Sequence, residues 1–252
     1  MRTLLLTILA LTLPAIGKEN AYDVVGKVLT PFGQVLAQSS KTANRAVTLN
    51  FHAEGGRNGT EAKTLPVRLS LEAPDRLRVT ATLEGEEVTV CRRGQEIWAY
   101  PGSRVKALLE DPAVLRKLPA ADSKFKLAPF ALPIPEKQLA FLPVLFKVQE
   151  VGDFELGGEV CRVLDLRLMP ELMKAVPAKQ GFVARIWVAP QYRLAQVDIA
   201  TTEGRATMHV DELSYARALP PATWQPTAEQ SGDIIPLQPK VYDQLIRGFL
   251  SP

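Results

Sequence analysis

The chain has 252 residues, of which 46% are hydrophobic and 23% are charged, and its formal net charge at pH 7 is +3. The hydrophobic content excludes a mainly disordered chain. The weak net charge, without a concentrated basic stripe, argues against nucleic-acid binding. Two cysteines and two histidines form no zinc-binding pattern. We therefore expect a folded protein with no metal and no other cofactor.

Residues 1–17 have the order of a secretory signal. The charged start at Arg2 is followed by an apolar run from Leu4 to Leu13, and small residues end at Gly17. The run is well short of the roughly 20 residues that span a bilayer. The alternative is a buried N-terminal helix of the mature fold. We expect export to the bacterial periplasm, cleavage near Gly17 and a soluble, single mature domain over residues 18–252.

Residues 21–38 have apolar side chains at helical spacing, which predicts an amphipathic helix. Pro31 lies inside it and predicts a kink or two short helices. After this segment the apolar period changes to two. Alternation and turn residues predict an antiparallel meander of five strands, at 46–53, 65–72, 76–83, 88–91 and 95–100.

The middle of the chain differs in composition. Residues 105–118 have helical spacing, whereas residues 125–146 are apolar and carry four prolines, which exclude a strand or one continuous helix. A short helix at 135–141 fits this segment. Alternation then predicts strands at 147–156, 159–168, 181–189, 192–201 and 205–216. A Pro-rich extended tail at 219–239 and a closing helix at 241–250 follow. About ten or eleven strands predict a curved antiparallel sheet with helices covering one face.

The sequence contains none of the common catalytic motifs GxSxG, P-loop, HExxH and CxxC. Asp165, Asp198 and Asp211 read as polar positions of alternating strands, and no spacing brings His52 or His209 to a carboxylate. We therefore expect a protein that is not an enzyme, with a hydrolase of dispersed site as a minor alternative.

The two cysteines, Cys91 and Cys161, both lie in predicted strands. In an oxidising compartment such a pair can form a disulfide. The alternative is two buried free thiols. The sequence leaves both open.

Segment 125–146 is either an ordinary core plug or a lid over an apolar cavity. A site for an acyl chain needs shape and dryness rather than reactive groups, because each buried CH₂ contributes roughly 0.8 kcal/mol. We predict that the cavity is lined by apolar residues of the meander and of this segment: Leu69, Leu71, Leu77, Val79, Ile97, Trp98, Phe130, Leu132, Ile134, Leu139, Phe141, Leu142 and Leu145. Alternation does not say which face of each strand is the concave one.

Three stretches then carry a resemblance: APDRLR at 73–78, VTVCRRG at 88–94 and IWAYP at 97–101. With WVAP at 187–190 and LPPATWQP at 219–226, this order of motifs resembles the LolA/LolB-like family of periplasmic lipoprotein-localisation factors. Arg76 or Arg78 falls where the family carries an arginine.

The resemblance implies an α+β, mainly antiparallel, unclosed half-barrel whose concave apolar face is lidded by helices. It also implies carriage of lipid or of lipoprotein acyl chains toward the outer membrane, with membrane-bound donor or acceptor proteins as partners. We expect a monomer. The alternative is a protein-interaction or sensor domain of the same fold, in which the convex face or the Pro-rich tail at 219–252 binds a partner.

Overall fold

The computed structural model describes residues 19–37, 44–57, 63–110, 125–132, 135–170, 183–200 and 204–243. The predicted signal at 1–17, most of the closing helix and the predicted cavity residue Ile134 lie outside these ranges. Among the described residues, no helix is both long and apolar enough to cross a membrane.

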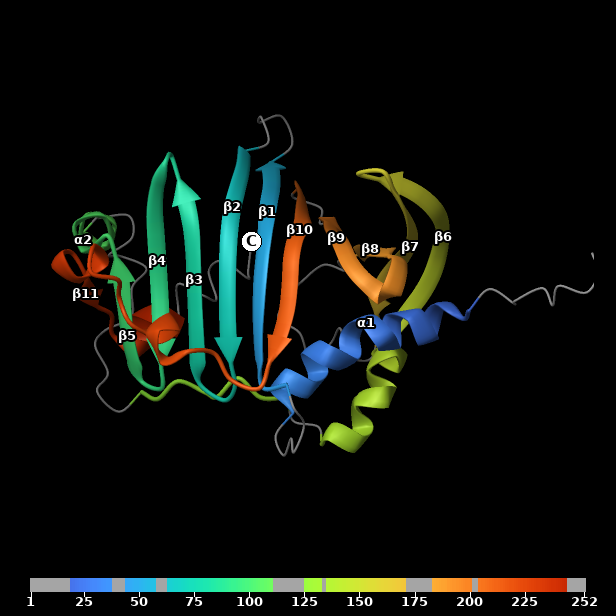
Figure 1. Cartoon of the computed structure of the whole chain (residues 1–252), viewed down its shortest axis with the longest axis horizontal. Helices are drawn as coiled ribbons and strands as arrows, with labels where there is room; N and C mark the ends of the chain where they lie inside the picture. Colours follow the sequence, from blue (N-terminus) through green and yellow to red (C-terminus); the bar gives the residue numbers. More distant parts are fainter. Residues whose placement is uncertain are drawn as a thin grey trace, which may run out of the picture.

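The described strands form one antiparallel sheet of 11 strands in the order β11-β5-β4-β3-β2-β1-β10-β9-β8-β7-β6 (Figure 1). The order ends at β11 and β6, so the sheet does not close. The predicted α+β half-barrel is confirmed. The strands are β1 (Ala46–Arg57), β2 (Lys63–Glu72), β3 (Arg76–Leu83), β4 (Glu86–Arg93), β5 (Glu96–Tyr100), β6 (Phe146–Leu156), β7 (Glu159–Leu168), β8 (Val183–Ala189), β9 (Arg193–Ala200), β10 (Gly204–Ala216) and β11 (Ile235–Pro236).

Two meanders, β1–β5 and β6–β10, meet where β1 pairs with β10, with Ala46 opposite Ala216. The predicted strand positions agree with ten of these strands. The exception is β11, which lies in the Pro-rich tail and pairs with β5 through only two residues. A strand that short has no alternating pattern to detect.

Side chains of successive strand residues alternate between two faces of the sheet. We call the face that carries Leu49, Leu69 and Leu164 the inner face, and the opposite one the outer face. Helix α1 (Ala21–Leu36) packs its valines on the inner face and crosses the sheet from β10 to β6 (Figure 1). Asn20 caps it by accepting a hydrogen bond from the backbone N–H of Tyr22 at 2.9 Å.

Pro31 lies inside α1, which is one helix from Ala21 to Leu36, so the predicted division into two short helices is wrong. Three smaller helical elements are α2 (Gly102–Glu110), the 3-10 helix η1 (Glu136–Leu145) and the 3-10 turn η3 (Pro221–Trp224). Residues 239–243 form the start of the predicted closing helix.

Candidate functional site: an apolar strip between two cores

Two separate cores cover the ends of the inner face. The first lies under α1, where Val25 and Val28 pack against Leu164, Ile186 and other residues of β7 to β9. The second lies at β4 and β5, where Ile97 and Ala99 pack against Leu127 and the C-terminal Tyr242. Between these two cores of the described residues, the inner face carries apolar side chains that belong to neither core.

The surface between the cores is formed by β2 and β3. Cross-strand pairing places Leu69 opposite Val79 and Leu71 opposite Leu77. We call the seven apolar inner-face residues of the two strands the inner strip: Leu65, Val67, Leu69, Leu71, Leu77, Val79 and Ala81. All seven are half-buried, and none belongs to either core. The structure thus brings four of the predicted cavity residues together on one apolar surface.

The lower end of the inner strip is bordered by residues 125–132, which run along the ends of β5 to β2 (Figure 1). The backbone N–H of Phe130 donates to the carbonyl of Pro74 in the β2–β3 turn at 2.6 Å, and that of Leu132 donates to Leu36 at the end of α1. Gln95 fixes the other end of the segment, because its side-chain amide exchanges two hydrogen bonds with the backbone of Leu127. This part of segment 125–146 therefore forms the lower border of the strip, and its role as a lid stays a prediction.

The upper end of the inner strip opens into a pocket of about 570 Å³. Its inner-face lining is small or apolar and comes from the ends of β1, β2, β3 and β10: Ala53, Gly55, Leu65, Leu83 and Ala206. Such a volume is within the range of about 300–1,000 Å³ that small-molecule sites have. Leu65 belongs to both the strip and the pocket, so the two are continuous.

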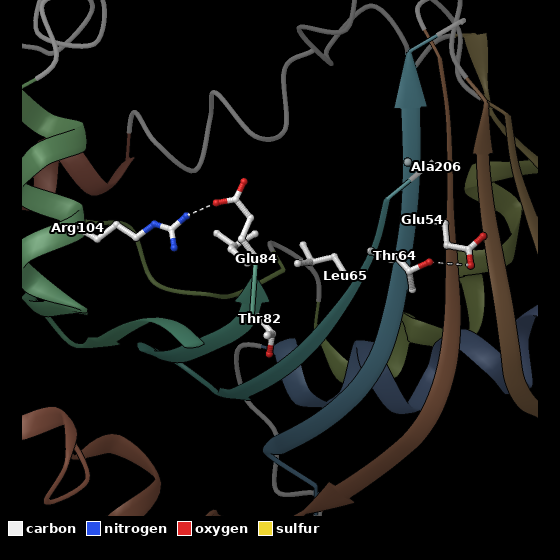
Figure 2. A pocket seen from close by; sticks show the side chains of 10 residues that line it. Glu54, Thr64, Leu65, Thr82, Glu84, Arg104 and Ala206 are labelled. Carbon is white, nitrogen blue, oxygen red and sulfur yellow. Dashed lines mark hydrogen bonds and ion pairs between the residues drawn. The ribbon is translucent and has the colours of Figure 1, made fainter. Parts of the chain in front are cut away.

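The rim of this pocket is charged. Figure 2 shows Arg104 reaching from α2 toward Glu84, and Glu54 with Thr64 on the far side. Arg104 also pairs with Glu86, with 2.5 Å between the guanidinium and the carboxylate, and this hydrogen bond raises the pKa of Arg104. The apolar strip thus ends at a polar mouth, which suits a ligand with one apolar and one polar end.

Two predicted cavity residues of β5 lie on opposite faces. Ile97 is on the inner face but is buried in the second core. Placing Trp98 in the cavity is wrong, because successive residues of a strand point to opposite sides. Trp98 lies on the outer face opposite Cys91, with the guanidinium of Arg78 5.4 Å from its ring.

The predicted lining from η1 is also wrong. Leu139 and Leu142 pack on α1, since a Cβ added at Gly33 would lie 2.8 Å from a methyl carbon of each. Phe141 is 65% exposed and Leu145 is 38% exposed. The helix η1 therefore forms a second layer on α1 rather than a cover for the sheet.

The two candidate arginines hold the C-terminal tail on the outer face. Arg78 donates to the backbone carbonyls of Thr223 and Gln225, each at 3.0 Å, and to the side-chain oxygen of Gln230 at 3.1 Å. Arg76 pairs with Glu72, and Glu72 accepts the backbone N–H of Leu219. These residues organise the tail and do not reach the inner strip.

Both cysteines are buried free thiols, so the disulfide alternative is not what the structure contains. Cys91 is on β4 and Cys161 is on β7, and six strands lie between them in the sheet. A disulfide needs Cα atoms within about 7 Å, and neighbouring strands are already about 4.8 Å apart.

One cluster escaped the sequence analysis. His52 and His209 lie directly opposite each other on the outer face where β1 pairs with β10. Nδ1 of His52 is 2.7 Å from a carboxylate oxygen of Asp211. Because this pairing joins two distant parts of the chain, no local spacing in the sequence predicts it. No group of three or more metal-ligating side chains occurs among the described residues.

Comparison with known proteins gives similar structures but no similar sequences. No family model and no curated protein matches the chain. A crystal structure of MucB in complex with MucA(peri) is 16% identical, with a TM-score of 0.40, over 83% of this chain and 61% of that one. This chain thus spans less than two thirds of MucB.

Two further structures match over nearly their whole length. The LolA superfamily protein from Nitrosomonas europaea is 9% identical with a TM-score of 0.32, over 82% of this chain and 98% of that one. The lipoprotein LppX from Mycobacterium tuberculosis is 10% identical with a TM-score of 0.40, over 80% and 99%. The solved structures that are similar to this chain thus include a LolA superfamily protein.

Proposed function

We propose that this chain is a periplasmic carrier that binds the apolar part of an amphiphile, such as an acyl chain of a lipid or of a lipoprotein, on the inner strip. The observation that supports it most directly is the apolar surface of β2 and β3, which is half-buried and lies between two complete cores. Covering it with a ligand removes apolar area from water at about 25 cal/mol per Å². Export rests on the signal pattern of residues 1–17.

The polar mouth supports an amphiphilic ligand rather than a purely apolar one. An acyl chain extended along the strip from Leu71 toward Leu65 would bring its head group to Arg104 and Glu84. Such a head group meets hydrogen-bonding side chains there and stays near water, which avoids the cost of burying a polar group without a partner.

The first experiment asks whether the protein carries a ligand. The mature chain is purified from the periplasm of its native host without detergent, extracted with organic solvent and measured by mass spectrometry. Stoichiometric amphiphile in the extract is the expected result. A clean extract combined with no uptake of a fluorescent long-chain fatty acid would favour the alternative, a protein-interaction domain of the same fold.

The second experiment locates the ligand. We expect Leu69→Gln with Val79→Gln to weaken binding of the fluorescent fatty acid at least about tenfold, which corresponds to about 1.4 kcal/mol. The matched control is Arg68→Gln, since Arg68 neighbours Leu69 in β2 but is exposed on the outer face. Circular dichroism of each variant checks the fold. Equal affinity in all three proteins contradicts the proposed site.

A further inference from the structure

The helix η1 exposes large apolar side chains that the carrier function does not use. Phe141 is 65% exposed and Val144 is 61% exposed. Residues three apart in a 3-10 helix lie on the same side, so these two form one row. Leu145 follows Val144 directly, and Met169 is next to Leu145 because its N–H donates to the carbonyl of Leu145; the two residues are 38% and 36% exposed. We call these four residues the η1 patch.

Basic side chains flank the η1 patch. Lys147 follows Val144 by three residues and is exposed at the start of β6. Arg167 lies opposite Lys147 in the β6–β7 pairing and is exposed as well. Opposite residues of an antiparallel pair have Cβ atoms about 5 Å apart, so two positive charges stand together on the outer face, two residues along each strand from Leu145 and Met169. Lys137, also exposed, adds a third charge on η1, four residues before Phe141.

Hydrophobic side chains next to basic ones fit a specific partner, the surface of an anionic bilayer. The apolar side chains enter the boundary between head groups and acyl chains, while lysine and arginine bind the anionic head groups. The helix η1 rests on α1 through Leu139 and Leu142, so the row of Phe141 and Val144 is on another side of η1 and stays exposed.

We propose that the η1 patch, with Lys137, Lys147 and Arg167, docks the protein reversibly on a membrane surface rich in anionic phospholipid. This inference does not rest on the proposed function, because the patch lies on η1 and just after the end of β7 rather than on the inner strip. A protein that only binds a partner through the patch would not need the anionic lipid.

The test is co-sedimentation of the full mature chain with vesicles of phosphatidylethanolamine, with and without phosphatidylglycerol. We expect binding that requires phosphatidylglycerol and falls with added salt. Phe141→Ser with Val144→Ser should weaken it at least about tenfold, and Lys147→Gln with Arg167→Gln by about tenfold or more, at roughly 1 kcal/mol for each basic side chain near the surface.

Two controls are matched to these variants. Val160→Ser removes an apolar side chain that is 66% exposed at the β6–β7 turn, and Lys106→Gln removes an exposed charge on α2. Both should bind vesicles as the unaltered protein does. No binding to phosphatidylglycerol vesicles, or equal losses in the control and patch variants, overturns the proposal. The patch variants should keep their affinity for the fluorescent fatty acid, which separates this result from a failure of the carrier function.

Discussion

The guanidinium carbon of Arg92 lies 4.5 Å from the ring centre of Phe130, so that a charge stacks on an aromatic face at the lower border of the inner strip. Arg92 is only 3% exposed. Its Nε donates to the carbonyl of Gly94 at 2.9 Å and one of its terminal nitrogens donates to Ala128 at 2.7 Å. Burial lowers the pKa of Arg92. This residue therefore joins β4 to segment 125–132.

Replacing Arg92 should loosen that segment. We expect Arg92→Gln to lower the free energy of unfolding by about 2 kcal/mol, because two carbonyls lose a charged donor. Hydrogen exchange at residues 125–130 should become faster. Arg92→Lys should not restore the stability, since an ammonium group lacks the planar fork that serves both carbonyls and the ring.

The neighbouring residue provides the control for this prediction. Arg93 points to the outer face and pairs with the exposed Glu96. Arg93→Gln should change the free energy of unfolding little, as is usual for exposed surface pairs. Urea unfolding of the three variants measures the free energies of unfolding. Equal decreases in Arg92→Gln and Arg93→Gln would contradict the role of Arg92 in joining β4 to segment 125–132.

Removing the arginine on the other face should free the tail. Arg78→Ala deletes three hydrogen bonds to residues 223–230 and the contact with Trp98. We expect limited proteolysis to cut residues 219–232 faster by about tenfold, since a 1.4 kcal/mol change in local opening has that effect. Arg68 lies on the same outer face of the sheet, in the neighbouring strand β2, and Arg68→Ala should leave the cutting rate unchanged. An unchanged cutting rate in Arg78→Ala would contradict the role of Arg78 in holding the tail.

Acid should lower the free energy of unfolding by protonating Asp198, which is buried in the sheet and only 4% exposed. Burial alone would raise the pKa of this carboxyl, but hydrogen bonds from Trp187, Thr207 and Gln196 bring the pKa below its usual value. A lowered folded-state pKa gives stability that is present above the unfolded-state pKa of about 3.9 and is lost as the pH falls through the folded-state value.

We therefore expect Asp198→Asn to be less stable than the unaltered protein at pH 7 and to lose less of its stability on acidification below about pH 4. Urea unfolding at a series of pH values measures both effects. Asp211→Asn serves as the comparison, because the Asp211 side chain is 46% exposed. Parallel stability curves for Asp198→Asn and the unaltered protein would contradict this assignment.

Chemical labelling should detect Cys91 and Cys161 as two free thiols. Burial raises the pKa of Cys91 to about 11 and also raises that of Cys161, so little thiolate exists near neutral pH. We expect slow labelling by iodoacetamide in the native state and, after denaturation without reductant, a mass increase of two labels for the chain. A chain that takes up no label until it is reduced would instead carry the disulfide.

Local patterns in the sequence were sufficient for most of the sheet. Alternation located β1 to β10 because each strand has one buried and one wetter face, and proline positions showed that 125–146 is neither a strand nor one continuous helix. The apolar pattern could not rank the residues of one strand by what covers them. Leu69 and Ile97 look alike in sequence, yet Leu69 lies on the open strip and Ile97 lies in a core.

Contacts between distant segments were beyond prediction from sequence. On the outer face, Trp98 contacts Arg78 of another strand. The helix η1 packs on α1 through other side chains, which leaves Phe141 exposed. The facing pair His52 and His209 depends on the register of β1 with β10. Each of these needs the tertiary structure, which no periodicity encodes.

The junction of β1 with β10 has a consequence for how the chain folds. Within each meander, every pairing joins strands that follow one another in sequence, so short loops close first and at low entropic cost. Pairing Ala46 with Ala216 instead requires the whole intervening chain to be arranged. The two meanders are thus natural folding units, and the order of synthesis lets the first form while the second is still on the ribosome. Two polypeptides divided between α2 and η1 should accordingly reassemble when mixed, through the β1–β10 pairing together with the packing of α1 on the second meander and of the C-terminal tail on the first.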